Sequence, residues 1–246
     1  MRSNTAAQSY RLSSLAWRSV EIITAFAAAA TVAVASAVEL PGELRHPQCV
    51  ACQQPAGAAR ALFSEADWRR LENAEVVIVE RRPTVADGDD DSFVSESEAA
   101  VIVPRPAAEV WAVLADFESR PEFLPNISES RVQRVEDTRV WISQHVRVLW
   151  MQIRYTLIMT LDPARGLMTS VLDRASPHDI RDSHGSWDIL PHGDASALLM
   201  SRSRVETGMP VPGFIESYLV KNSLPQMMTR LRDEVERRAK ASASVR

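Results

Sequence analysis

Glycine and cysteine are scarce in this chain, and their scarcity excludes several kinds of site. The 246 residues include only 8 glycines and 2 cysteines. No G-x-x-x-x-G-K or G-x-G-x-x-G loop is present to cradle a phosphate, and neither G-x-S-x-G nor H-E-x-x-H occurs. The sequence therefore lacks the strong signatures of nucleotide binding, serine hydrolysis and zinc proteolysis, and we expect no cofactor and no metal ion.

An excess of positive charge is also missing. The chain carries 28 basic and 32 acidic residues, which gives a net charge of −4. Because nucleic-acid binding needs a basic face, this balance predicts no nucleic-acid partner. Hydrophobic residues make up 46% of the chain and charged residues 24%, an ordinary globular composition that predicts a packed core.

The first 37 residues have the pattern of a targeting sequence. Three arginines precede an apolar, alanine-rich run at residues 22–34, and the small-x-small sequence Ala35-Ser36-Ala37 follows it. The run is shorter than the roughly 20 apolar residues of a membrane-spanning helix. We therefore predict a signal peptide over residues 1–37, with export to a periplasm or to the exterior. A mitochondrial transit peptide and an uncleaved leader that anchors the chain in a membrane stay open as alternatives.

Both cysteines belong to one C-x-x-C pair. Cys49 and Cys52 lie in a proline-containing segment, residues 38–63, which we interpret as a linker or a small stapled loop. In an exported protein a disulfide is the default for such a pair. Haem c attachment is excluded because residue 53 is Gln53 and not histidine. A redox role remains an alternative, as does a metal site that would recruit His46 but lacks a fourth ligand.

Residues 64–92 form an extension before the main domain. Ser64 and Asp67 resemble the start of a capped helix that runs to about residue 73, and residues 74–79 predict a strand. An acidic loop follows at residues 84–91. Its alternating aspartates suggest calcium, but Ser92 stands where an EF-hand loop needs glycine, so we favour a solvated loop.

The most informative stretch is residues 99–125, with the sequence AAVIVPRPAAEVWAVLADFESRPEFLP. Its β-branched residues 101–103 predict a strand. Pro104 and Pro106 end that strand, and Pro106 also suits the first turn of a helix with an apolar stripe. Two further prolines stop the helix and brace an aromatic turn.

This arrangement resembles the first strand and helix of the helix-grip superfamily, which includes START domains, polyketide cyclases and coenzyme Q-binding proteins, exported bacterial types among them. SHGSWDILP at residues 183–191 is similar to the family's Gly-x-Trp strand, and residues 205–238 are similar to its last strand and C-terminal helix. The resemblance covers residues 93–240 and leaves a short tail at residues 241–246. It implies an α+β helix-grip fold, in which a curved antiparallel β-sheet wraps around a long C-terminal helix and encloses a hydrophobic cavity.

Hydrophobic periodicity supports that sheet. Apolar and polar residues alternate over 140–150 and again over 151–161, which predicts two antiparallel strands. Only Gln144 interrupts the apolar side of the first strand. A helix is predicted from residue 213 to residue 238, and Pro225 should kink or split it. Shorter strand candidates lie at residues 167–172, 185–190 and 197–205.

A ligand cavity in this fold would need a wall of large, adaptable side chains. Each buried CH₂ group contributes about 0.8 kcal/mol, and methionine and aromatic residues conform to irregular ligands. Trp187, Phe214 and Tyr218 rank first because they match the family's sheet centre and lid helix, and Tyr155 could hydrogen-bond a polar head group. Trp141 ranks last because its parity is opposite to that of the alternating apolar residues in its own strand. The alternative is that the same side chains only form a core. The predicted ligand-binding residues are Trp111, Phe117, Phe123, Leu124, Trp150, Tyr155, Met159, Trp187, Phe214, Tyr218, Met227 and Met228.

Two further features of the sequence each allow a functional and a purely structural interpretation. His178, Asp179, Asp182 and His184 cluster in the sequence and could move protons, or they could form a polar loop. Two proline-braced loops, residues 122–125 and 208–214, carry apolar side chains that could make transient membrane contact, or they could cap the core.

The sequence leaves three hypotheses for function. The leading one is binding and shielding or transport of a hydrophobic small molecule, such as a quinone, a polyprenyl or an acyl lipid, without chemistry. The second is a polyketide cyclase- or dehydratase-like enzyme in which Tyr155, His184 or Asp182 moves protons, and a polar cluster facing the cavity would favour it. The third is a non-catalytic interaction protein that recruits a partner through the acidic loop and the C-x-x-C segment, with core side chains filling the cavity.

Overall fold

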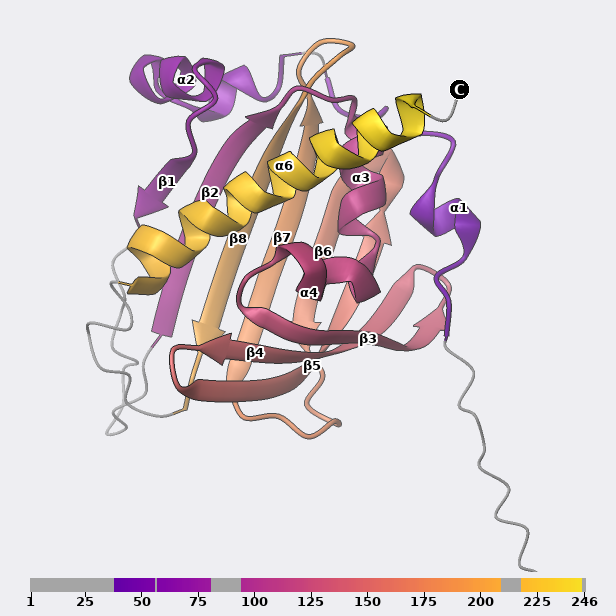
Figure 1. Cartoon of the computed structure of the whole chain (residues 1–246), viewed down its shortest axis with the longest axis vertical. Helices are drawn as coiled ribbons and strands as arrows, with labels where there is room; N and C mark the ends of the chain where they lie inside the picture. The colour runs from indigo at the N-terminus through magenta and orange to yellow at the C-terminus, as the bar shows by residue number, and fades with distance from the viewer. Residues whose placement is uncertain (1–37, 56, 81–93, 209–217, 245–246) are drawn as a thin grey trace, which may run out of the picture. The chain divides into compact units, whose positions relative to one another are not determined.

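The computed structural model describes residues 38–55, 57–80, 94–208 and 218–244, all of which belong to one compact unit. Its centre is an eight-stranded antiparallel sheet with the order β1-β2-β8-β7-β6-β5-β4-β3 (Figure 1). The predicted leader, the acidic loop and the loop at residues 209–217 lie outside the described residues. No helix in the described ranges is long and apolar enough to cross a membrane.

The strands follow one another as hairpins, apart from the segments that carry helices. The strands are β1 (Val77–Glu80), β2 (Val94–Val103), β3 (Ile127–Glu136), β4 (Arg139–Val148), β5 (Met151–Asp162), β6 (Leu167–Leu172), β7 (Asp182–Pro191) and β8 (Ala197–Glu206). The helices are α1 (Gly42–Arg45), α2 (Glu65–Glu72), α3 (Ala107–Leu114), α4 (Arg120–Phe123) and α6 (Leu224–Ala243). Shorter helical turns are η1 (Arg60–Leu62), η2 (Phe117–Ser119), η3 (Pro163–Arg165) and the π-helical η4 (Leu219–Ser223).

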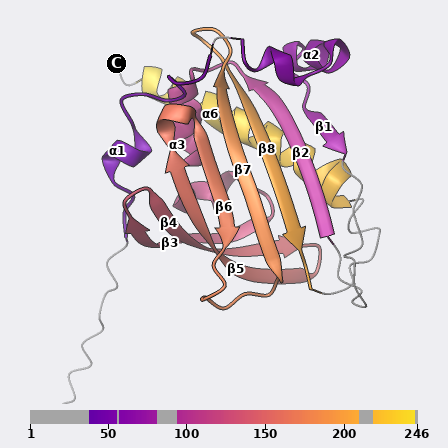
Figure 2. The ribbon, with the colours of Figure 1, turned by 180° about the vertical axis from the view of Figure 1, so that it is seen from behind.

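The alternation of side chains gives the sheet two different faces. On the inner face, Ile142, Met159 and Leu199 are completely buried against α3 and α6 in the main core. Figure 1 shows α6 crossing in front of this face, and Figure 2 shows the opposite face from behind. On the outer face, Trp68 and Leu71 of α2 pack in a second, smaller apolar cluster. The predicted helix-grip fold is confirmed by this curved antiparallel sheet and long C-terminal helix.

Pro225 determines where the long helix begins. A proline in the second position of α6 donates no hydrogen bond, and none is needed there. The π-helical η4 leads directly into α6, so the regular α-helix starts at Leu224, beside Pro225; residues 213–217 of the expected helix lie outside the described residues. The apolar stripe of α6, which includes Met228, Leu231 and Val235, faces the core.

Several local expectations needed correction. The helix after Pro106 ends well before the prolines expected to stop it, because α3 ends at Leu114 and Phe117 begins the separate turn η2. The periodicity missed β3, an edge strand that is mostly polar and exposed. Of the two interpretations of residues 38–63, the structure agrees better with the stapled loop than with the linker, because the segment includes α1, η1 and the disulfide, and its loop bonds to the turn between β5 and β6.

Candidate functional site

A cavity of about 350 Å³ lies between the inner face of the sheet, α4 and the start of α6. It reaches the end of the sheet where β2 and β7 begin, beside the β4–β5 turn. Side chains from β2, β4, β5, β6, β7 and β8 line it, so residues far apart in the sequence meet around one space. This volume is at the lower end of the range, about 300–1,000 Å³, that is typical of small-molecule sites.

One wall of the cavity is apolar. It comes mainly from β4 and β5, with contributions from the residue that follows α4, the start of β3, the loop before β7, β7 and α6. In both of these strands the alternate residues that face inward are almost all hydrophobic, as the period-two pattern predicts. The main apolar lining residues are Leu124, Ile127, Val146, Val148, Met151, Ile153, Leu157, Met159, Ile180, Trp187, Leu224 and Met227.

The opposite wall is lined by small polar residues on four adjacent strands. Ser203 of β8 pairs with Ser97 of β2 on one side and with Gly185 of β7 on the other, and Gly185 pairs with Ser170 of β6. A Cβ atom at Gly185 would lie 2.8 Å from the Ser170 Oγ atom, so glycine keeps this wall open. The wall is completed by Ser95, Ser183 and Ser201. We refer to these seven residues as the serine wall.

A cation enters the cavity from α4. Arg120 is only 6% exposed, and its Nη2 atom donates a hydrogen bond to the Leu114 carbonyl oxygen at 3.2 Å. Its guanidinium also lies 4.7 Å from the centre of the Phe117 ring. Burial lowers the pKa of Arg120 to about 10, against the opposing influence of Tyr155 and Asp116. Arg120 therefore remains charged at neutral pH in an environment that disfavours its charge.

Tyr155 and Gln144 face each other across β4 and β5 and add further polar groups. Burial raises the pKa of Tyr155 to about 12, although the positive charge of Arg120 partly offsets it. The phenol is therefore neutral at physiological pH and can donate a hydrogen bond, but it is a poor base. The Gln144 Nε2 atom donates to the Ser130 hydroxyl at 3.5 Å. Arg120, Tyr155 and Gln144 form what we call the polar head of the cavity.

The structure divides the twelve predicted ligand-binding residues into groups. Five of them line the cavity: Leu124, Tyr155, Met159, Trp187 and Met227. Four others, Trp111, Phe117, Phe123 and Met228, are buried core residues outside the described lining. Trp111 belongs there because its Nε1 atom donates to the Leu44 carbonyl oxygen at 2.8 Å, which leaves the indole fully buried.

The remaining predicted residues lie elsewhere. Trp150 is 68% exposed in the β4–β5 turn and does not line the cavity, because the strand ends before it. Tyr218 is half-buried next to η4 and is not among the described lining residues. Phe214 lies outside the described residues. Trp141 is on the outer side of β4, where the Arg134 guanidinium stacks 3.8 Å from its ring centre.

The sequence search for an apolar wall missed Arg120 and the serine wall. A signal was present, because Ser95 and Ser97 alternate with glutamates, and Ser201 and Ser203 alternate with arginines. The charged residues of these alternations point outward, and the serines point inward. Alternation of this kind in β2 and β8 indicates which side of each strand the serines occupy, although it does not by itself show that this side lines a cavity.

The histidine and aspartate cluster lies away from the polar head. Asp182 and His184 share the parity of the outward-facing β7 residues, and the His184 Nε2 atom lies 2.9 Å from an Asp182 carboxylate oxygen. Asp179 accepts a hydrogen bond from the Arg154 backbone N–H at 2.8 Å, which holds the pKa of that carboxyl below its usual range. The Asp179 contact stabilises the loop before β7, whereas Asp182 and His184 pair within β7 itself; His184 is among the residues that line the cavity, but neither aspartate is.

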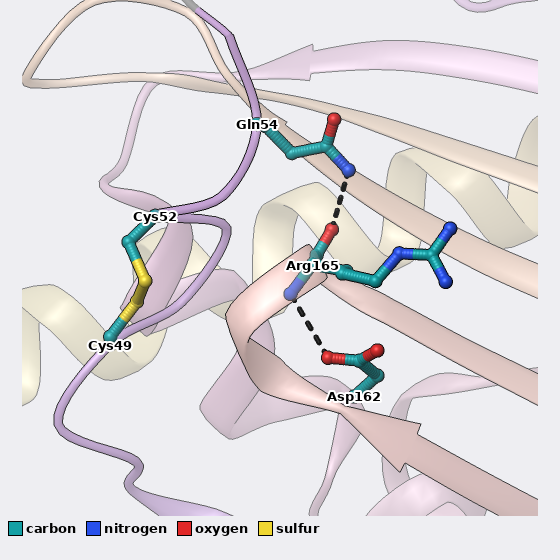
Figure 3. The surroundings of a disulfide bond; sticks show 5 residues. All are labelled: Cys49, Cys52, Gln54, Asp162 and Arg165. Carbon is teal, nitrogen blue, oxygen red and sulfur yellow. Dashed lines mark hydrogen bonds between the residues drawn. A yellow bond between two sulfur atoms is a disulfide. The ribbon is translucent and has the colours of Figure 1, made fainter.

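A loop of the N-terminal segment is the other candidate site. Cys49 and Cys52 are joined by a disulfide (Figure 3). The Gln54 Nε2 atom donates to the Arg165 carbonyl oxygen at 2.8 Å, and the Arg165 backbone N–H donates to Asp162 at 3.1 Å. The disulfide loop is therefore fastened to the turn between β5 and β6. Among the described residues, no group of three or more histidine, cysteine or acidic side chains could hold a metal ion.

The fold and the cavity together define the helix-grip class of domains. A family model described as polyketide cyclase/dehydrase and lipid transport matches residues 95–240, more than half of the chain. The chain belongs to this polyketide cyclase/dehydrase and lipid transport family. The curated proteins include no relative that matches this sequence.

Solved structures show the same fold at low sequence identity. The Zhui aromatase/cyclase from Streptomyces sp. R1128 is 21% identical with a TM-score of 0.53, covering 61% of this chain and 98% of its own. A START superfamily protein from Mycobacterium smegmatis is 21% identical with a TM-score of 0.50, covering 58% and 97%. A STAR-related lipid transfer protein fragment from Xanthomonas axonopodis is 16% identical with a TM-score of 0.50, covering 63% and 98%. These neighbours include both enzymes and lipid carriers, so they support the fold and leave the activity open.

Proposed function

We propose that this protein binds a hydrophobic small molecule in its cavity and shields or transports it. The observation that carries the proposal is the cavity itself, which is large enough for a ligand and has an apolar wall on one side. Burial of apolar ligand surface against that wall supplies the affinity, and the polar groups fix the orientation. A cavity of about 350 Å³ also counts against the third hypothesis, in which core side chains fill this space.

The volume limits the size of the ligand. A benzene molecule occupies an apolar cavity of roughly 150 Å³, so about 350 Å³ accommodates two or three such units. A quinone ring or a short acyl chain is of this size, whereas a full polyprenyl tail would extend beyond the cavity. Among the candidate ligands, the compact ones are therefore favoured.

A second candidate, a cyclase-like enzyme, is supported by the polar head. Arg120 is a fixed positive charge that could stabilise an oxyanion formed during ring closure. The proton-transfer part of that hypothesis is weaker, because Tyr155 is a poor base and His184 and Asp182 face outward. Binding without chemistry remains the simpler proposal.

We also propose that the protein is exported, and the disulfide between Cys49 and Cys52 supports this because disulfides persist in oxidising compartments. The structure describes only the first of the two loops, residues 122–125, in the membrane-contact hypothesis. Phe123 and Leu124 are buried, at 9% and 6% exposure, so they cannot dock on a membrane from this position. The second loop of that hypothesis lies outside the described residues.

The test is native mass spectrometry of the purified chain, combined with lipid extraction. Ser203→Phe should abolish a co-purifying ligand, because a benzene-sized ring needs a cavity of roughly 150 Å³ and would therefore use a large part of the available space. Thr169→Phe is the matched control, since Thr169 has the outward parity on β6. An empty wild-type protein that also takes up no added quinone or lipid would refute the proposal.

A further inference from the structure

The surroundings of Arg120 lack a counter-ion. In the described part of the chain, no carboxylate oxygen forms an ion pair with its guanidinium. Asp116 is the acidic group whose charge acts on it, but Asp116 is already paired with Arg238 at 2.7 Å and with Arg45 at 3.9 Å. Arg120 is thus a buried cation, and the acidic residue that influences it, Asp116, is paired with two other arginines.

The hydrogen-bonding capacity of Arg120 is also largely unused. A guanidinium has five N–H donors, and the bond to the Leu114 carbonyl is the one hydrogen bond it donates within the described residues. Arg120 lines the cavity, so its remaining N–H donors are available to a group inside the cavity. The Tyr155 hydroxyl has no hydrogen-bond partner in the same part of the structure and lines the same space.

These groups have one chemical property in common, which is that they offer protons for hydrogen bonds. Arg120 has donors only, and a phenol with a raised pKa remains a donor at neutral pH. A cation that is buried without a partner is costly, and an anionic ligand oxygen would remove that cost and use the free donors. A neutral ligand with no acceptor would leave them unpaired.

We infer that the cavity takes a ligand that carries a carboxylate or another anionic oxygen at its enclosed end, paired with Arg120 and within reach of the Tyr155 hydroxyl. The inference rests on the proposed function and specifies its ligand class. The rest of the ligand lies along the apolar wall of β4 and β5 and has the size of two fused rings or a short acyl chain. Aromatic acids and fatty acids share this chemistry.

The test compares pairs of probes that differ in charge and hardly in shape. Calorimetric titration of the purified chain uses 2-naphthoate against 2-naphthamide, and decanoate against decanamide. Because a hydrogen bond to a charged group is the stronger kind, each carboxylate should bind about tenfold to a hundredfold more tightly than its amide. The affinities of the two carboxylates, compared with each other, distinguish an aromatic acid from a fatty acid as the source.

Variants show which residue gives the preference. In Arg120→Met the advantage of the carboxylate should disappear, while the affinity for the amide changes by no more than about twofold. Arg131→Met is the matched control, because Arg131 is an exposed residue of β3 that pairs with Glu129, and it should keep the preference. Tyr155→Phe should reduce the preference by a smaller factor and provides a second test if Arg120→Met does not fold.

The outcomes separate the two proposals. If amides and carboxylates bind equally well to the wild-type protein, or if Arg120→Met keeps the preference for the carboxylate, the inference is wrong and the binding function stands. If none of the four probes binds and no added lipid or quinone binds either, the proposed function itself fails. A preference that disappears in Arg120→Met and persists in Arg131→Met supports both.

Discussion

Replacement of Arg120 with methionine should leave the stability of the protein nearly unchanged, although the side chain is almost completely buried. Methionine is flexible and apolar, and it can occupy the space of the arginine stem without a charge. The free energy of unfolding should stay within about 1 kcal/mol of the wild-type value, whereas truncation of a large buried side chain usually costs about 2–5 kcal/mol.

The magnitude follows from the surroundings of Arg120. Burial lowers its pKa to about 10, and at about 1.4 kcal/mol for each pKa unit this disfavours the folded, charged state by about 3 kcal/mol. Methionine removes that penalty. It also removes the hydrogen bond to the Leu114 carbonyl, which contributes about 1.5–3 kcal/mol. The contact of the guanidinium with the Phe117 ring contributes about 1 kcal/mol more. Gain and loss therefore nearly cancel.

The measurement is urea unfolding of both forms at pH 7. This pH is suitable because the folded-state pKa of Arg120 is lowered, so its penalty is fully present below about pH 10 and declines as the pH rises above that value. Met228→Ala is a comparison, because Met228 is completely buried and uncharged, and this variant should lose about 2–5 kcal/mol.

A loss of more than about 3 kcal/mol in Arg120→Met would refute this reasoning. It would show that the guanidinium joins α3 to α4 as a structural bridge, and that its contact with the Leu114 carbonyl outweighs the cost of its burial. A small change together with lost carboxylate binding would show that the charge serves a ligand. Natural proteins accept such unfavourable groups where function needs them.

Three further predictions concern other parts of the molecule. Tyr155→Phe should remove the most alkaline step from the tyrosinate absorbance titration, because burial raises the pKa of Tyr155 to about 12; an unchanged titration would contradict the buried phenol. The stability that the neutral phenol provides is complete below pH 10 and is lost as the pH rises to about 12. Cys49→Ser combined with Cys52→Ser should lower the free energy of unfolding by about 2 kcal/mol in urea under non-reducing conditions, and an equal stability would mean that the loop needs no cross-link. Leu149→Asn should raise the melting temperature slightly, by the equivalent of about 0.5–1 kcal/mol, since Leu149 has φ +54° in the β4–β5 turn and is 42% exposed; a lower melting temperature would show that the leucine side chain contributes to packing.

The strands were predictable wherever one face of the sheet is apolar and the other polar. The boundaries expected for β4, β5 and β6 agree closely with the structure, and in β4 and β5 the reason is that apolar inward residues alternate with mostly polar outward ones. Edge strand β3 was not predicted because it lacks a regular alternation of apolar and polar residues. Only Val132 is a buried apolar residue in it, and its pairing with β4 has two register shifts, so no simple period remains.

The site was less predictable than the fold, for a physical reason. Large apolar residues such as Trp111 and Met228 satisfy the same pattern whether they face a cavity or a packed core, and only the three-dimensional packing distinguishes the two. Arg120 gave no signal because it stands in a short helix among prolines, where a charged residue is expected to be exposed. Its burial depends on the position of α4 over the sheet, which no local pattern specifies.

The polar groups of the cavity bear on the choice between a carrier and an enzyme in two ways. Removal of a proton from a carbon atom needs a base, and the described lining contains no carboxylate; its one histidine, His184, has the outward parity. What the lining does contain is a fixed positive charge, a neutral phenol and the hydroxyls of the serine wall. Such a set can bind and orient an oxygen-bearing ligand and stabilise negative charge on it, which suits the proposed carrier and also the charge-stabilising part of the cyclase-like candidate. The described lining therefore supplies no carboxylate base, and the support for the cyclase-like candidate rests on Arg120, which would stabilise the charge that develops on a bound ligand.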